Sequence, residues 1–150
     1  MQDFQTLDDI LDFAIVQEIA AQAFYTKLSH EAPSKDMQLF YRTLVEEEQT
    51  HEKKLRQLKS RTFDMAPPDL SELQKSGYLD ALPISPEMSL KDVLLYALKK
   101  ERSAKMLYGV MADNMKQQDL ADLFKTLAAQ EGKHADFFRK EYDDVCATAD

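Results

Sequence analysis

The chain repeats itself with an offset of 83 residues across two pairs of segments. Seven residues between Leu7 and Tyr25 match the seven that lie 83 positions later, between Leu90 and Tyr108. A further six, between Asp36 and Arg56, match their counterparts between Asp119 and Arg139. Self-similarity over a fixed offset indicates that one supersecondary unit is used twice. The sequence therefore predicts two copies of one motif, and any site that both copies share would be built from two near-equivalent sets of residues.

The repeated unit reads as a pair of helices. Apolar residues return at three- and four-residue steps in four long segments, which is the period of an amphipathic helix. Each segment follows a residue suited to an N-cap, and the predicted caps are Thr6, Asp36, Ser89 and Asp119. The pairs span about 6–60 and 89–142, the fourth helix ending near Tyr142. The predicted core rows include Phe40 in the second helix, and Leu123 and Phe137 in the fourth.

A segment from about 61 to 88 separates the two pairs and holds four of the five prolines. Only 69–75 within it suggests a short helix. A connection of this length suits a bundle whose second and third helices run parallel. We therefore expect an all-α, ferritin-like four-helix bundle, made of two helical hairpins and a long crossover, in which residues 1–150 form a single domain.

Composition narrows the classes of partner and compartment. The formal net charge of -8 argues against duplex nucleic acid or an anionic membrane as a partner, because both require a basic surface. No apolar run approaches the roughly 20 residues of a membrane span. The single cysteine, Cys146, cannot close an intramolecular disulfide, and no charged, apolar leader begins the chain. We expect a cytoplasmic protein.

Six ionisable residues interrupt the apolar rows at repeated positions. Glu18 and Glu101 stand where the rows of the first and third helices should continue, and each of the other two helices carries a Glu-x-x-His pair on one face. Each glutamate lies 12 residues after its predicted cap, near the middle of its helix. The predicted metal ligands are Glu18, Glu48, His51, Glu101, Glu131 and His134.

Four buried carboxylates need compensation by protons or by cations. One Glu from each of two helices and Glu-x-x-His from each of the other two form the di-iron or di-manganese pattern of ferritin-like bundles. Imidazole and carboxylate ligands suit these ions, and the absence of cysteine from this set argues against an iron-sulfur cluster or a thiolate zinc site. Tyr25 and Tyr108 each lie seven residues, or two helical turns, after Glu18 and Glu101. Their hydroxyls could donate hydrogen bonds to the ligands, or their rings could simply pack in the core. The neighbouring acidic residues are expected on solvated helix faces, where they could pair with Lys53 and Lys54; they are Glu46, Glu47, Glu52 and Asp136.

The segments Glu18–Tyr25, Glu46–His51 and Glu131–His134 resemble the metal-binding helices of the rubrerythrin and ferritin-like di-iron family. The resemblance implies two iron ions per chain, bridged by Glu48 and Glu131, that reduce peroxide or dioxygen. The sequence departs from the family in three ways. It has no four-cysteine rubredoxin site, so a separate protein is expected to donate electrons, and it has Ala104 where rubrerythrins carry an additional carboxylate. It also has no methionine at the haem-ligand position of bacterioferritin, so no haem is expected.

Three functions remain open at this point. The first is a di-iron oxidoreductase that acts on peroxide or oxygen. The second is an iron-binding or storage protein with ferroxidase chemistry, and the third is a metal-free helical interaction module. A long crossover can exchange between protomers, so a homodimer is also expected.

Overall fold

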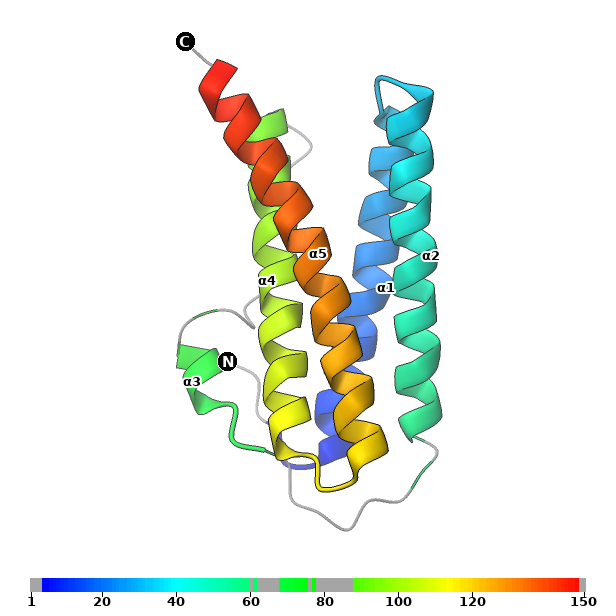
Figure 1. The fold of residues 1–150 in the computed structure, drawn as a ribbon, viewed down its shortest axis with the longest axis vertical. Coiled ribbons are helices and arrows are strands. Elements are labelled where there is room, and N and C mark those ends of the chain that lie inside the picture. Colours follow the sequence, from blue (N-terminus) through cyan, green and yellow to red (C-terminus); the bar gives the residue numbers. More distant parts are fainter. Residues whose placement is uncertain (1–3, 60, 62–67, 76, 78–87, 149–150) are drawn as a thin grey trace. The chain divides into compact units, whose positions relative to one another are not determined.

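The computed structural model describes residues 4–59, 61, 68–75, 77 and 88–148. Five helices account for most of them (Figure 1), and the described residues contain no strand. The all-α class is therefore confirmed. Most of the predicted crossover lies outside the described residues, although a short helix does form in it. The helices are α1 (Leu7–Glu31), α2 (Lys35–Lys59), α3 (Ser71–Lys75), α4 (Leu90–Asn114) and α5 (Gln118–Thr148).

The helices group into two compact units, one within residues 4–67 and one that contains residues 68–150. In the first unit α1 packs against α2, and in the second α4 packs against α5. Each pair is antiparallel and joined by a short connection (Figure 1). The two predicted hairpins are confirmed.

The repeat in the sequence is also a repeat in the backbone. Helix α4 begins and ends exactly one offset of 83 residues after α1, and α5 begins one offset after α2. Both turns have the same geometry, because Ala32 and Met115 are extended C-caps. Their N–H groups donate to the carbonyls of Ser29 and Ala112, each at 3.4 Å. Equivalent residues of the two hairpins can therefore be compared position by position.

The predicted helix starts are right for one member of each hairpin and wrong for the other. Thr6 and Ser89 are N-caps whose side chains accept the N–H three residues later. Asp36 and Asp119 lie inside the first turns of α2 and α5, where the positive end of the helix dipole still stabilises a carboxylate. In α2 the hydroxyl of Ser34 takes the capping role and accepts the N–H of Met37 at 3.1 Å.

Two further corrections concern α2 and α5. Helix α5 runs to Thr148, past the predicted end near Tyr142. The buried aromatic residues of α2 and α5 are Tyr41, Phe124 and Phe138, whereas the predicted Phe40, Leu123 and Phe137 are only half-buried. The positions three and four residues before a core leucine both lie near its face, so apolar character alone does not decide which is buried.

The two hairpins have closely matching cores. Tyr41 and Phe124 occupy equivalent positions, and Leu55 and Phe138 form another equivalent pair with no exposed surface.

Among the described residues, no helix combines the length and the apolar content that crossing a membrane would need.

The start of α1 allows a stability prediction. The Thr6 hydroxyl accepts the N–H of Asp9 at 3.1 Å, and the Asp9 carboxylate accepts the N–H groups of Gln5 and Thr6. These backbone donors hold the pKa of Asp9 below its usual value. Its contribution to stability is therefore complete above the unfolded pKa, near 4, and is lost as the pH falls through the lower folded pKa.

We expect Thr6→Ala to lower the free energy of unfolding by about 1 kcal/mol in urea titrations at pH 7. Asp9→Asn should flatten the fall in stability with acidification relative to the exposed control Asp8→Asn. Identical pH profiles for the two asparagine variants would contradict this assignment.

Candidate metal centre

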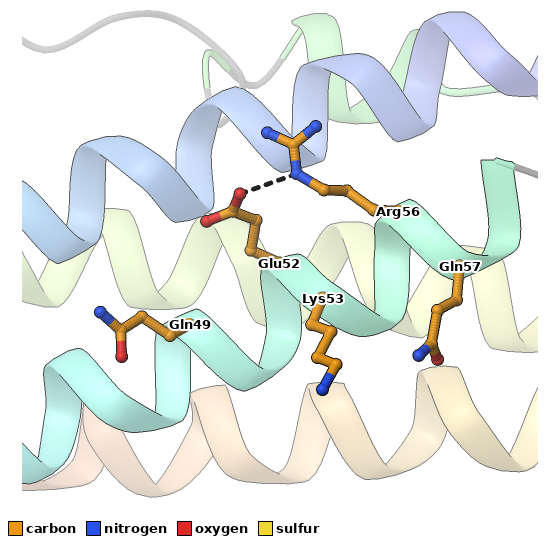
Figure 2. A pocket seen from close by; sticks show the side chains of 5 residues that line it. All are labelled: Gln49, Glu52, Lys53, Arg56 and Gln57. Atoms are coloured by element: carbon orange, nitrogen blue, oxygen red, sulfur yellow. Dashed lines mark hydrogen bonds and ion pairs between the residues drawn. The ribbon is translucent and has the colours of Figure 1, made fainter.

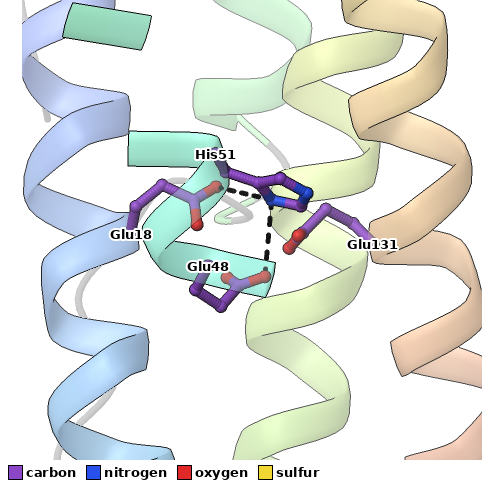
Figure 3. A group of neighbouring side chains, drawn as sticks. All are labelled: Glu18, Glu48, His51 and Glu131. Carbon is purple, nitrogen blue, oxygen red and sulfur yellow. Dashed lines mark ion pairs between the residues drawn. The ribbon is translucent and has the colours of Figure 1, made fainter. Parts of the chain in front are cut away.

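Each hairpin carries one cluster of two glutamates and one histidine. The first triad comprises Glu18 on α1 with Glu48 and His51 on α2, and the three side chains point toward one another (Figure 3). His51 Nδ1 lies 3.5 Å from Glu18 Oε1 and 3.4 Å from Glu48 Oε1. One potential ligand atom from each of the three lies within 4.8 Å of the others. This geometry leaves room for a cation between them.

The second triad repeats this arrangement on α4 and α5. His134 Nδ1 lies 3.4 Å from Glu101 Oε2 and 3.9 Å from Glu131 Oε1. The ligand atoms of these three side chains also lie within 4.8 Å of one another. The structure therefore brings together the predicted ligands of each hairpin, and the same ring nitrogen faces the carboxylates in both.

Helix geometry explains why each triad forms. Residues three apart lie on one face of a helix, so Glu48 stands beside His51 and Glu131 beside His134. The antiparallel partner helix contributes the third side chain, because its glutamate interrupts the row that packs across the hairpin. Glu18, for example, lies between the buried residues Ile15 and Tyr25 of α1.

All six residues are buried, with none more than 5% exposed. Carboxylates are seldom buried to this extent unless they are paired or coordinate a metal. The donor set consists of carboxylate oxygens and imidazole nitrogens, which suit iron or manganese. The residues present in each hairpin therefore fit the metal that the sequence predicts.

The two tyrosines predicted behind the ligands are among the most deeply buried residues. Tyr25 is 1% exposed on α1 and Tyr108 is 2% exposed on α4. The Tyr108 ring packs against Phe124 of the facing helix, with the ring centroids 6.1 Å apart. Packing is thus one role of Tyr108, and the predicted role of both hydroxyls beside the ligands stays a prediction.

A side-chain hydrogen bond beside the first triad was not predicted. Gln22 on α1 donates to Glu52 on α2 at 2.8 Å, and Arg56 donates to the same carboxylate at 2.7 Å (Figure 2). Both hydrogen bonds lower the pKa of Glu52, and the bond from Gln22 has the larger effect. The sequence had suggested Lys53 and Lys54 as possible partners of Glu52, and the structure shows hydrogen bonds to its carboxylate from Gln22 and Arg56. Glu52 and Arg56 are among the side chains that line a hollow along α2 (Figure 2).

The equivalent part of the second hairpin differs. The counterparts of Gln22 and Gln49 are Lys105 and Gly132, and the aliphatic part of Lys105 lies over Gly132 at ordinary contact distance from where a Cβ would stand. The two triads are thus alike in their ligands but not in their neighbours. Comparison across the offset of 83 could have revealed this difference from the sequence.

A family model supports the interpretation drawn from these side chains. The rubrerythrin model matches residues 9–81 and 92–150. The chain belongs to the rubrerythrin family. The matched ranges include both triads, and the family assignment suggests that the buried groups bind a di-iron centre. No match to the chain is found among curated proteins.

Membership of the rubrerythrin family makes one departure notable. Ala104, half-buried on α4, occupies the position one turn after Glu101 at which rubrerythrins are expected to have an additional carboxylate. At this position the chain cannot supply a further carboxylate ligand. The second triad therefore has the same number of candidate ligands as the first.

The buried carboxylates should cost stability when no metal is bound. Replacing Glu48 by the isosteric, neutral Gln removes one of the negative charges that repel each other. We expect Glu48→Gln to raise the melting temperature of the metal-free protein, measured by calorimetry in chelator, by about 2–4 °C for each kcal/mol gained. The exposed control Glu46→Gln should leave it unchanged, and a lower melting temperature for Glu48→Gln would contradict the expected repulsion.

Proposed function

We propose that the two triads together hold one pair of iron ions, and that the protein is an oxidoreductase that reduces peroxide or dioxygen. The observation that carries this proposal is the recurrence of one buried triad, Glu plus Glu-x-x-His, in both hairpins of a rubrerythrin family member. Glu48 and Glu131 would bridge the ions. The terminal ligands would be Glu18, His51, Glu101 and His134.

Charge balance supports two divalent ions per chain. Four ionised glutamates carry four negative charges, which two divalent ions neutralise. Three protein ligands per ion leave open coordination positions, and Glu48 and Glu131 could fill some of them if each bound both ions. Each glutamate also lies near the middle of its own helix.

The chain's own residues would position the cations and keep the site dry. The bound iron pair supplies the two electrons that convert hydrogen peroxide to water, a reaction that also consumes two protons. The triads fix the ligand oxygens and nitrogens in advance, and their burial limits competing access of water. The hydroxyls of Tyr25 and Tyr108 are the candidate donors of hydrogen bonds toward the site.

Electrons would come from a redox centre outside these 150 residues. The 150 residues contain one cysteine, whereas a rubredoxin-type iron site needs four. The donor would have to bring its redox centre close to the triads.

A second candidate function is ferroxidase chemistry for iron storage or detoxification. Ala104 favours it, because this position lacks the carboxylate expected of rubrerythrins and leaves a six-ligand set closer to that of bacterioferritin. The two candidates differ in the fate of the iron. An oxidoreductase returns the metal to the ferrous state with its two ions retained, whereas a storage protein accumulates iron far beyond two per chain.

Anaerobic titration with ferrous iron tests the shared site. We expect saturation at two ions per chain in the unaltered protein. Glu131→Gln should lower this stoichiometry or raise the dissociation constant at least tenfold, an effect of the size expected when metal ligation is disturbed. The matched control is the exposed Glu46→Gln, which should bind as the unaltered protein does. Equal iron binding by the Glu131 and Glu46 variants would overturn the ligand assignment.

Mixing the loaded protein with oxidant tests the reaction. We expect peroxide to oxidise both ferrous ions faster than oxygen does, with repeated turnover when a chemical reductant is supplied. Accumulation of many ferric ions per chain without turnover would select storage instead. If the protein binds less than one ion per chain, and Glu48→Ala combined with Glu131→Ala gains thermal stability without loss of metal, the metal-free interaction module is the correct function.

A further inference from the structure

The residues that directly follow the ligands on α2 are long and polar, whereas their counterparts on α5 are the two smallest amino acids. They are Gln49 and Glu52 on α2, and Gly132 and Ala135 on α5. Because the members of each pair are three residues apart, they lie on one face of their helix. Next to its ligands, the second hairpin therefore has much less side-chain volume on α5 than the first has on α2.

In the first hairpin, a hydrogen bond between the two helices closes this layer. Gln22 of α1 donates to the Glu52 carboxylate of α2 at 2.8 Å. Both residues lie one helical turn after a glutamate of the first triad, so the bond joins the helices directly beside the ligands. The side chain of His51, the histidine of this triad, is only 1% exposed.

In the second hairpin, one long side chain takes the place of this bond. Lys105 of α4 is the counterpart of Gln22, and its Cδ and Cε atoms lie 3.4 Å from the point where a Cβ of residue 132 would stand. Lys105 thus fills space that Gly132 leaves open. The side chain of His134 is 6% exposed, against 1% for its counterpart His51. The second triad is therefore the less completely sealed of the two.

The Lys105 side chain is able to move away from Gly132. Lys105 is exposed, and its ammonium group forms no hydrogen bond or ion pair with any residue that the structure describes. Exposed side chains change rotamer within picoseconds to nanoseconds. Rotation of Lys105 uncovers Gly132, which directly follows the ligand Glu131, without any movement of the helices.

The charge of Lys105 selects what can pass beside it. A lysine can lay its methylene groups along a small, apolar surface while its ammonium group stays in water. The positive charge then attracts anions and repels cations at the same place. The counterpart in the first hairpin, Gln22, is neutral. The space beside Gly132 therefore suits a small anion or a small neutral molecule and disfavours a metal ion.

We propose that Lys105 is a specificity-determining residue that covers an entrance to the second triad beside Gly132. The entrance admits small anionic or neutral molecules of about the size of peroxide, because the open space corresponds only to the side chains that residues 132 and 135 lack. The first triad has no such entrance, since the bond between Gln22 and Glu52 closes the equivalent layer. That the entering molecule is the oxidant rests on the proposed function, whereas the cover itself does not require bound metal.

Alkylation of an engineered thiol tests the cover without iron. In a Cys146→Ser background, Ala135→Cys places a thiol beside His134, and neutral iodoacetamide reports its accessibility in the presence of chelator. Lys105→Ala should raise the alkylation rate about tenfold because the covered state is lost, whereas Lys105→Met, which keeps the long side chain, should change it less than about twofold.

The exposed control Lys99→Ala should alkylate as the parent does, and circular dichroism and the melting temperature should be retained in each variant. The methionine variant also controls for the effect of the lysine charge on the thiol. Equal alkylation rates for Lys105→Ala and Lys99→Ala, or for Lys105→Ala and Lys105→Met, would overturn the proposal.

Azide binding to the oxidised, iron-loaded chain tests the charge selection. Lys105→Met should lower the association rate of azide about threefold at low ionic strength, and the difference should disappear in about 1 M salt. Lys99→Met should have a smaller effect. A rate unchanged by Lys105→Met in a chain that holds two iron ions would overturn the entrance and leave the proposed function intact. Failure to bind iron would overturn the proposed function instead, and the alkylation rates would then decide the cover by themselves.

Discussion

The structure depends on the burial of two carboxylates and an imidazole in each helical hairpin. Such groups are costly in an apolar interior unless a charge of opposite sign is provided. Each triad presents oxygen and nitrogen atoms at distances that a metal ion can bridge, from residues no more than 5% exposed. Cation binding then contributes to the stability of the fold as well as to chemistry, since a ligand bound only by the folded state stabilises that state.

Much of this arrangement could be predicted from the sequence because the repeat supplies an internal comparison. A single Glu-x-x-His on an acidic helix says little, but two of them at one offset, each with a glutamate 30 residues upstream, specify a register. The helix bounds of α1 and α4 follow from Thr6 and Ser89, whose hydroxyls are effective caps. The errors arose where the sequence offers competing signals. Ser34 and Asp36 are both plausible caps, and Phe40 and Tyr41 are both plausible core residues.

The contacts of long, polar side chains could not be predicted in the same way. Glu52 has neighbouring lysines in the sequence, yet its carboxylate accepts hydrogen bonds from Gln22 on the facing helix and from Arg56 one turn later. The choice of hydrogen-bond partner depends on how closely two helices approach each other, and the periodicity of the sequence does not predict that approach. The same holds for Lys105, whose aliphatic chain covers Gly132.

Comparison of the two hairpins separates what the fold requires from what function adds. The triads, the caps of α1 and α4 and much of the core are shared, so one backbone and one set of ligands are used twice. Some differences exchange one buried apolar residue for another, such as Leu55 for Phe138, whereas changes of polarity occur at exposed positions, such as Val16 against Lys99. Residues that differ between copies with the same backbone are candidates for roles that only one copy performs.

The central claim is that both triads share one pair of iron ions, and magnetic spectroscopy of the oxidised, iron-loaded protein tests it most directly. Two bridged ferric ions couple their spins, so Mössbauer spectra of iron-57 protein should show a diamagnetic ground state for the bound iron, and electron paramagnetic resonance should be nearly silent. High-spin signals from isolated ferric ions that account for the bound iron would contradict the claim, because each triad would then hold its metal alone.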